Sequence, residues 1–168
     1  MLFTQFIHLL QMVALVALQV LLLNHIHLFG YATPMVFVAF MLYFPLNASR
    51  IGTLLWGFTM GLVVDVFSNT LGMATASMTL AAMVQHPLLS VMVPRDAADN
   101  IMPNYSTMGR ANYIRFVVLL VLIHHLAFYL LESFTFHHAQ QLLISFLSGT
   151  LLSILLILVI EVFRSKRS

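Results

Sequence analysis

The chain has 168 residues, of which 61% are hydrophobic and 7% are charged, and its formal net charge is +2. Soluble globular domains carry about 25% charged residues, so this composition excludes a soluble fold and predicts an integral membrane protein with a single domain. The absence of cysteine excludes disulfides and thiolate metal sites. The few basic residues are scattered, which argues against nucleic-acid binding and indicates membrane topology instead.

Two apolar runs open the chain, at residues 5–23 and 31–46. The first has about the 20 residues that a helix needs to cross a bilayer. It lacks the basic segment and the small-residue cleavage site of a signal peptide, so we expect a retained membrane helix. His8, Gln11 and Gln19 share one sector of this helix, where packing against neighbouring helices is the expected role. A turn rich in Gly and Pro precedes the second run, which we expect to be a short membrane span.

The next two apolar runs, at residues 51–67 and 71–93, are separated only by Ser68-Asn69-Thr70. Helices joined by so short a connection are antiparallel neighbours, so a helical hairpin is expected. Within the first arm, Gly57, Gly61 and Asp65 are spaced by four residues and therefore share one helical face. Glycines let two helix backbones approach closely. We expect Gly72 to continue this packing face onto the second arm.

Asp65 is the only acid between Met1 and Arg95. A carboxylate at the centre of a membrane helix costs roughly 2.5–3.5 kcal/mol on insertion scales, so it needs a purpose. Three roles are open: Asp65 could couple protons or bind a ligand, pair with another span or a partner protein, or lie solvated in the membrane interface. Because no Lys or Arg is expected at its depth, its partner would be a His, a hydroxyl or a group of another chain.

Residues 94–112 form the one long polar connection. We expect a cytoplasmic loop whose Arg95 and Arg110 could contact a cytoplasmic partner, although a plain solvated connector explains the composition equally well. Two further spans follow, at residues 113–131 and 139–163.

One face of the fifth expected span carries His125, Tyr129 and Glu132, at spacings of four and seven residues. Together with Asp65 these side chains could line a polar pocket that opens outward. The eight histidines do not converge at metal-ligand spacing, so neither a metal site nor a cofactor is predicted. No nucleophile elbow, phosphate loop or pair of catalytic acids appears in the sequence, so an enzyme is not expected.

With six spans, all seven Lys and Arg residues lie on the side of the N-terminus. A five-span arrangement would scatter the same charges over both sides. Because basic residues favour the cytoplasmic side of a membrane, we predict an all-α protein with six transmembrane helices and with both termini in the cytoplasm.

The stretch from Pro45 to Ala76 resembles the rod shape-determining protein MreD family. The resemblance consists of a proline that ends the second span, an Arg-bearing inner turn, and Gly61-Leu62-Val63-Val64-Asp65 followed by Leu71-Gly72. The chain length, the six expected spans and the basic tail are similar to that family as well. Gly61, Asp65 and Gly72 match the family motif, whereas Gly57 and the inner loop are not assigned by it.

This resemblance implies a non-catalytic membrane scaffold of the bacterial elongation machinery, or elongasome, in the cell inner membrane. Such a scaffold helps to set cell shape and lateral peptidoglycan synthesis. The implied partner is a single-span membrane protein of the MreC type. Further implied partners are MreB filaments, the RodA polymerase and a class B penicillin-binding protein.

The same resemblance supplies an alternative function. The MreD family is thought to be similar in fold to the six-helix substrate-binding subunits of energy-coupling factor vitamin transporters. Those subunits usually dock on their coupling protein through an Ala-x-x-x-Ala pattern in the first helix, whereas Ala14 and Ala17 are three residues apart here. This spacing counts against a transporter subunit but leaves the alternative open.

Overall fold

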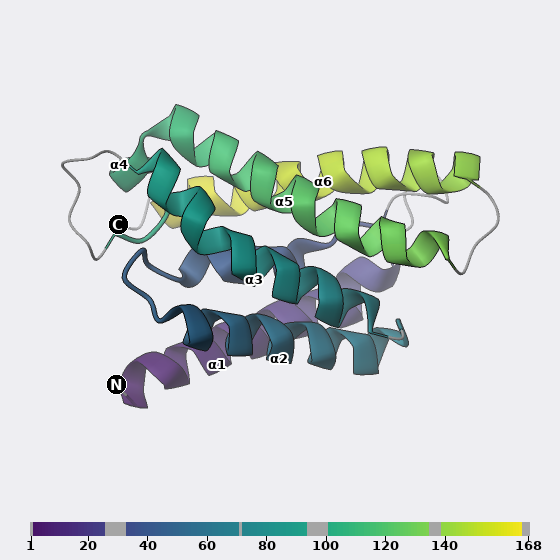
Figure 1. Ribbon diagram of the computed structural model, residues 1–168, viewed down its shortest axis with the longest axis horizontal. Coiled ribbons are helices and arrows are strands. Elements are labelled where there is room, and N and C mark those ends of the chain that lie inside the picture. Colours follow the sequence, from purple (N-terminus) through teal and green to yellow (C-terminus); the bar gives the residue numbers. More distant parts are fainter. Residues whose placement is uncertain (1, 26–32, 71, 94–100, 135–138, 166–168) are drawn as a thin grey trace.

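The computed structural model describes residues 2–25, 33–70, 72–93, 101–134 and 139–165. Every regular element in these residues is a helix (Figure 1), which confirms the predicted all-α class for this part of the chain. The elements in chain order are α1 (Leu2–Ala17), η1 (Leu18–Leu22), η2 (Leu23–His25), η3 (Val36–Tyr43), α2 (Arg50–Ser68), α3 (Met73–Met92), α4 (Tyr105–Met108), α5 (Arg110–Ser133) and α6 (Ala139–Ser165).

Among the described residues, four helical stretches are long and apolar enough to cross a membrane. They are Phe3–Leu22, Arg50–Ser68, Arg110–Ser133 and Gln140–Arg164. These stretches overlap four of the six expected spans. Helix α3 has a comparable length of 20 residues, but Thr, Ser, Gln and His interrupt its apolar residues, and it is not among the four.

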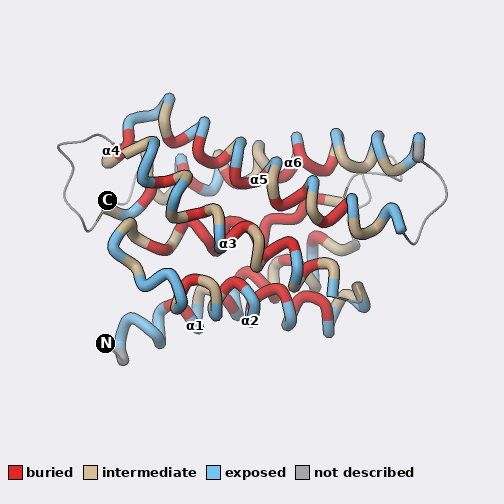
Figure 2. The backbone as a smooth tube through the Cα atoms, in the orientation of Figure 1, coloured by how far each residue is buried: buried red, intermediate tan, exposed pale blue. Residues whose placement is uncertain are grey.

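The helices form an elongated bundle, with both chain termini at one end and the turn between α2 and α3 at the other (Figure 1). Helices α2 and α3 make one antiparallel pair and α5 and α6 make another, and α3 packs against both α2 and α5. Both chain termini lie at one end, which we call the terminal end. The opposite end, where α2 turns into α3, is the hairpin end. The buried residues gather where the helices face one another (Figure 2).

The expected second span, 31–46, is a short 3-10 helix in its described part rather than a full membrane helix. Residues Val36 to Leu42 of η3 are all buried, and η3 packs against α1, α2, α3 and α6 inside the bundle. The reason lies in the sequence around it, because Pro34 and Pro45 leave room for few helical turns between them.

Buried polar side chains satisfy the backbone at the start of η3. Gln19 accepts a hydrogen bond from the Val36 N–H at 3.0 Å and donates one to the Pro34 carbonyl at 2.9 Å. The Met35 N–H donates to Ser153 Oγ at 2.8 Å. The ends of a short helix leave backbone groups unpaired, and such groups are costly in an apolar interior. These contacts therefore explain why Gln19 and Ser153 are buried.

The same logic applies at the end of η3, where Gln85 of α3 donates to the Phe44 carbonyl at 3.1 Å. Gln19 itself lies in η1, a single π-helical turn that continues α1. Such turns shift the side chains that follow them around the helix axis, and they are frequent at functional positions.

Two residues with left-handed backbone conformations reverse the chain between α2 and α3. Asn69 ends α2 with φ 55°, and Gly72 precedes α3 with φ 87°. Both residue types tolerate this conformation better than most, and both are common at helix ends. The expected hairpin is present, and Leu71 between these residues lies outside the described part.

Two glycines of α2 set how closely α3 approaches. A Cβ atom added at Gly61 would lie 2.5 Å from the Ala74 carbonyl oxygen, and one added at Gly57 would lie 2.6 Å from Ala82 Cβ. Both separations are far below van der Waals contact, so only glycine fits at these positions. The expected packing face of α2 therefore meets α3 directly.

The described part of the expected loop 94–112 contains one short helix and the first turn of α5. Helix α4 begins with a capping box formed by Asn104 and Thr107, and α5 already starts at Arg110. Pro103 and Met108 are buried against the bundle. The reciprocal cap and these two buried residues hold in place a segment whose composition is otherwise polar. Residues 94–100 lie outside the described part.

Candidate functional site

The side chain of Asp65 joins the end of α2 to the start of α3. Its carboxylate accepts hydrogen bonds from the Ala74 N–H at 3.0 Å and the Thr75 N–H at 2.7 Å. The hydroxyl groups of Thr70 and Thr75 donate to it as well. Four donors from three residues therefore surround one carboxylate, which is 7% exposed.

This arrangement replaces a missing helix cap. The residue before α3 is Gly72, which has no side chain and makes no side-chain cap. The free N–H groups and the positive end of the helix dipole favour a negative charge at this place. Asp65 supplies that charge from the neighbouring helix. The arrangement matches the role in which Asp65 pairs with another span through hydroxyl groups.

The sequence predicts that Gly72 continues the packing face onto α3, but in the structure it does not. It is exposed, and a Cβ atom added to it would meet nothing within 4 Å. Its φ of 87° is what favours glycine there. Ala74, Met78 and Ala82 of α3 meet the glycines of α2 instead. The spacing argument failed because the chain turns at Gly72 before α3 comes into register with α2.

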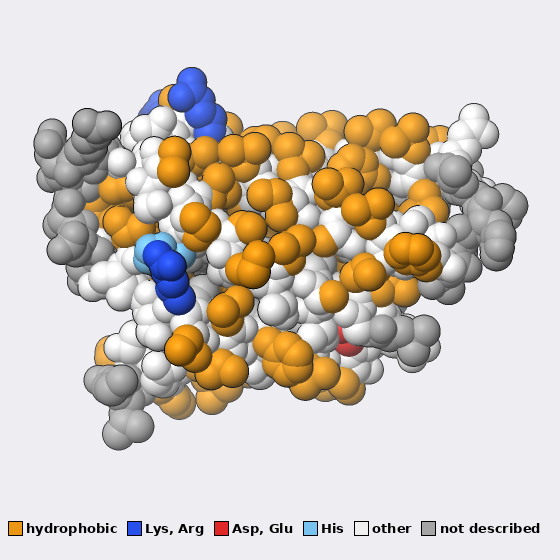
Figure 3. Space-filling view, viewed as in Figure 1, with side chains coloured by type: hydrophobic (Ala, Val, Ile, Leu, Met, Phe, Trp, Pro, Cys, Tyr) orange, Lys and Arg blue, Asp and Glu red, His pale blue; other side chains and the backbone are white. Residues whose placement is uncertain are grey.

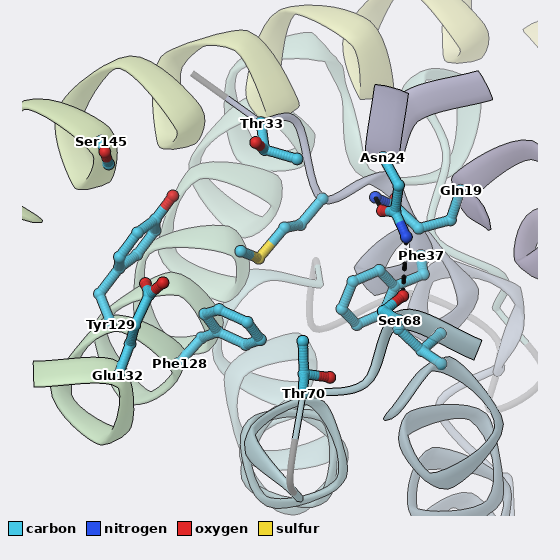
Figure 4. Close-up of a pocket in the computed structure, with 12 residues that line it drawn as sticks. Gln19, Asn24, Thr33, Phe37, Ser68, Thr70, Phe128, Tyr129, Glu132 and Ser145 are labelled. Atoms are coloured by element: carbon cyan, nitrogen blue, oxygen red, sulfur yellow. Dashed lines mark hydrogen bonds between the residues drawn. The ribbon is translucent and has the colours of Figure 1, made fainter. Parts of the chain in front are cut away.

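A polar cavity of about 300 Å³ opens at the hairpin end of the bundle (Figure 4). The ends of five segments contribute to it: α1 with its continuation, η3 with the residues before it, α2, α5 and α6. Its lining residues are Gln19, Asn24, Thr33, Met35, Phe37, Val64, Ser68, Thr70, Phe128, Tyr129, Glu132 and Ser145. This volume is at the lower end of the range for small-molecule sites.

One wall of the cavity is a chain of hydrogen-bonded polar side chains. Gln19 donates to Asn24 Oδ1 at 3.0 Å, and Asn24 Nδ2 donates to Ser68 Oγ at 2.7 Å. Figure 4 shows this group on the side of the cavity opposite Tyr129 and Glu132. The chain ties the end of α1 to the end of α2, and it fixes the orientation of the groups that face the cavity.

The opposite wall carries the acid and two aromatic rings. Phe128 and Tyr129 precede Glu132 on α5 by four and three residues, so both lie next to it on the helix surface. Tyr129 fits beneath α6 because Gly149 has no side chain: a Cβ atom there would lie 3.0 Å from the Tyr129 hydroxyl. Glu132 is half-buried and makes no hydrogen bond or ion pair with any residue that the structure describes.

The structure brings Tyr129 and Glu132 to the cavity, but it does not bring Asp65 or His125 there. The Asp65 carboxylate is hydrogen-bonded within the α2–α3 hairpin. His125 is buried between helices, with Nδ1 3.0 Å from the Val121 carbonyl oxygen and Nε2 3.0 Å from Ser153 Oγ. A carbonyl oxygen only accepts, so Nδ1 carries the proton in its contact with Val121. Ser153 Oγ also donates to the Gly149 carbonyl at 2.7 Å, so the contact ties His125 to a hydroxyl that α6 holds in place. Helical spacing gave the face of α5, but it could not show that α6 covers His125.

A second polar cluster lies at the terminal end. The buried Glu161 carboxylate lies 3.2 Å from the Tyr113 hydroxyl and 3.4 Å from an Arg164 nitrogen. Arg164 also lies over the Tyr43 ring, 5.3 Å from its centre, and donates to the Pro103 carbonyl at 3.4 Å. These contacts fasten the end of α6 to α5, to η3 and to the segment before α4.

The two arginines expected to meet a cytoplasmic partner are placed unequally. Arg110 is exposed at the start of α5, also at the terminal end, whereas Arg95 lies outside the described residues. The described residues contain no group of three or more metal-ligating side chains. His27, His137 and His138 lie outside the part of the chain that can be judged.

Sequence reasoning missed the amide wall of the cavity. The break of the first apolar run at Asn24 was visible, and Gln19 was a polar residue within that run. Neither signal shows that these two side chains meet, or that Ser68 from a distant segment completes the chain. Comparisons with known proteins add nothing further, because no protein-family model, curated protein or solved structure matches the chain.

Proposed function

We propose that the chain crosses the bacterial inner membrane six times, with both termini in the cytoplasm. The direction of the chain supports six crossings. α1, η3, α2, α3, α5 and α6 run alternately toward and away from the hairpin end (Figure 1). Four of these segments are the long apolar stretches, and α3 has a similar length.

The short segment around η3 is long enough for this role. A 3-10 helix rises about 2.0 Å per residue and extended chain about 3.3 Å, so residues 33–46 reach at most about 36 Å. The hydrocarbon core of a bilayer is about 30 Å thick. Backbone without α-helical bonds is tolerated at membrane depth where protein buries it, and η3 is buried.

The distribution of charge supports the orientation. Arg50, Arg110, Arg115 and Arg164 lie at or near helix ends of the terminal end, whereas Asp65 and Glu132 lie toward the hairpin end. On the face drawn in Figure 3, the blue Arg side chains gather toward the end with both termini. Basic residues favour the cytoplasmic side, which would place the hairpin end and its cavity on the periplasmic side.

Within this topology, a non-catalytic scaffold of the elongation machinery, similar to MreD, is the function we favour. The observation that carries this proposal is the α2–α3 hairpin. The residues that resemble the MreD motif, Gly61, Asp65 and Gly72, all shape this hairpin: one admits α3, one caps it and one turns the chain. A motif devoted to building a rigid surface fits a scaffold better than it fits catalysis.

A partner of the MreC type would associate through the outer surface of the bundle. The spans α1 and α6 are the least enclosed, with 28% and 22% of their residues buried against 44% in α5. An apolar groove of about 390 Å³ also runs between α1 and α2. Such surfaces suit lipid and a single partner helix alike. MreB, RodA and a class B penicillin-binding protein would join the complex with that partner.

The cavity favours a second candidate, a substrate-binding subunit of an energy-coupling factor transporter. A polar cavity that opens at the periplasmic end is what such a subunit needs. Against this candidate, no Ala-x-x-x-Ala pattern is present in α1.

Affinity purification from the native host in mild detergent separates the two candidates. Co-purification of a single-span periplasmic protein with elongation polymerase components is the result expected for the scaffold. A coupling protein with two ATPases would overturn it in favour of the transporter subunit.

The hairpin is tested by comparing Gly61→Leu with Gly52→Ala in the same purification. Gly61→Leu should lose the partner and cell shape, whereas Gly52→Ala should keep both, because the nearest atom to its added Cβ is 3.5 Å away. Partner capture and rod shape unchanged in folded Gly61→Leu would contradict a role for this surface.

A further inference from the structure

We propose that the cavity at the hairpin end binds a zwitterionic group, with an ammonium at one end and a phosphate-type oxyanion at the other. Phosphoethanolamine represents this chemistry, either free or as the headgroup of a phospholipid. The inference rests on the cavity alone, so it stands whether the chain is a scaffold or a transporter subunit.

The ammonium end is specified by Glu132. This carboxylate lines the cavity and has no partner among the residues that the structure describes. An acid in a membrane protein is costly to leave unpaired, and it usually meets a cation or a proton donor. The rings of Phe128 and Tyr129 line the same wall, and aromatic faces attract cations. A primary ammonium would satisfy the acid with charge-assisted hydrogen bonds and would also lie against the rings.

The oxyanion end is specified by the opposite wall. Ser68 Oγ accepts from Asn24, which leaves the Ser68 proton available to donate. Asn24 Nδ2 uses one of its two hydrogens in that bond. Both hydrogens of the Gln19 amide nitrogen are used, because it donates to Asn24 and Pro34. The hydrogens that remain on this wall are those of the Ser68 hydroxyl and the second Asn24 N–H, and both can donate to an acceptor such as a phosphate oxygen.

The two walls together favour a ligand that carries both charges. A plain anion would meet the Glu132 charge, and a plain cation would leave the Ser68 and Asn24 donors unused. Figure 4 shows Glu132 and Ser68 on opposite sides of the cavity, so the two charged groups of one ligand would face opposite walls. The cavity volume of about 300 Å³ admits a small headgroup.

Two binding measurements on detergent-purified full-length protein distinguish the free compound from the lipid. The first titrates O-phosphoethanolamine by calorimetry, with glycerol 3-phosphate as the probe that lacks an ammonium. The second measures retention of phosphatidylethanolamine by native mass spectrometry, with phosphatidylglycerol as the matched lipid. Glu132→Gln and Ser68→Ala remove one wall each. Ser133→Ala, at an exposed neighbour of Glu132, is the control.

In at least one of the two measurements, we expect the protein to bind the ammonium-bearing probe more tightly than the probe without an ammonium. Glu132→Gln should weaken this binding about tenfold or more, as loss of one charge-assisted hydrogen bond predicts. Ser133→Ala should bind as wild type. Success with O-phosphoethanolamine assigns a soluble ligand, and success with the phospholipid alone assigns a headgroup.

Three outcomes would overturn the proposal. Wild-type protein could bind no ammonium-bearing probe. It could bind the ammonium-free probes equally well, a comparison that needs no variant to fold. Binding could also remain unchanged in folded Glu132→Gln and Ser68→Ala. Because neither measurement involves the partner proteins, these outcomes would leave the scaffold proposal intact.

Discussion

Two carboxylates at the hairpin end, Asp65 and Glu132, have opposite surroundings. Asp65 near the end of α2 accepts hydrogen bonds from two N–H groups and two hydroxyls, and it is 7% exposed. Glu132 near the end of α5 faces the cavity without a partner among the described residues. In the sequence both are isolated acids near the end of an apolar run.

The number of hydrogen-bond donors around each carboxylate distinguishes an acid that stabilises the fold from an acid that can bind a ligand. Asp65 completes the first turn of α3, so the hairpin itself accounts for its carboxylate. Glu132 caps no helix in the described part of the chain, and it lines the cavity instead. Counting donors around each carboxylate makes this distinction, whereas depth and helical face do not.

Of the four substitutions, Gly61→Leu should destabilise the protein most, because it acts on the α2–α3 hairpin. The new side chain would overlap the backbone of α3 at Ala74 and Thr75. We expect a loss of about 3 kcal/mol or more in the free energy of unfolding, or no folded protein. Thermal unfolding in detergent measures it. Gly52→Ala should stay within about 0.5 kcal/mol of wild type, and an unchanged melting temperature for Gly61→Leu would contradict the close approach.

Asp65→Ala removes the carboxylate while leaving the glycines in place. The N–H groups of Ala74 and Thr75 would lose their acceptor inside the hairpin. We expect a destabilisation of about 2–4 kcal/mol, since several buried donors become unpaired at once. Asp65→Asn should fall between Ala and wild type, because it keeps one acceptor oxygen. Equal stability of all three proteins would refute the capping role.

Gln19→Leu tests the amide wall from the side of the fold. The Val36 N–H and the Pro34 carbonyl would lose their partner at the buried start of η3. A loss of about 2 kcal/mol is expected in the same unfolding measurement. Gln11→Leu is the control, since Gln11 is only half-buried and pairs with one neighbour, His8, at 3.2 Å. If both substitutions had the same small effect, Gln19 would not cap η3.

Glu132→Gln should have the smallest effect on the free energy of unfolding, and it tests directly whether the two acids differ. Without a described partner to lose, and with an unpaired charge removed, the substitution should lower the free energy of unfolding by no more than about 0.5 kcal/mol and can raise it. Measured beside Asp65→Asn, it gives the contrast directly. A destabilisation by Glu132→Gln as large as that of Asp65→Asn would show that Glu132 has a structural role, and the distinction between the two acids would fail.

Local patterns predicted several features correctly. The three-residue connection at Ser68-Asn69-Thr70 indicated the hairpin, and the spacing of Gly57 and Gly61 indicated the face of α2 that packs on α3. Both features follow from short-range geometry, which helical periodicity reports. The pocket prediction was less complete: it named Tyr129 and Glu132 but also Asp65 and His125, whose side chains point into the protein interior.

What the sequence determined by itself is the all-helical, strongly apolar character of the chain and its division into helical runs, because composition and period report them directly. Only the tertiary structure decided that residues 36–43 form a buried 3-10 helix, and that Gln19, Gln85 and Ser153 satisfy the backbone at its ends. It also decided that four donors surround Asp65, whereas Glu132 has no hydrogen-bond partner among the described residues. The physical reason is that hydrogen-bond partners come from segments far apart in the chain, and no local period encodes which donor meets which acceptor.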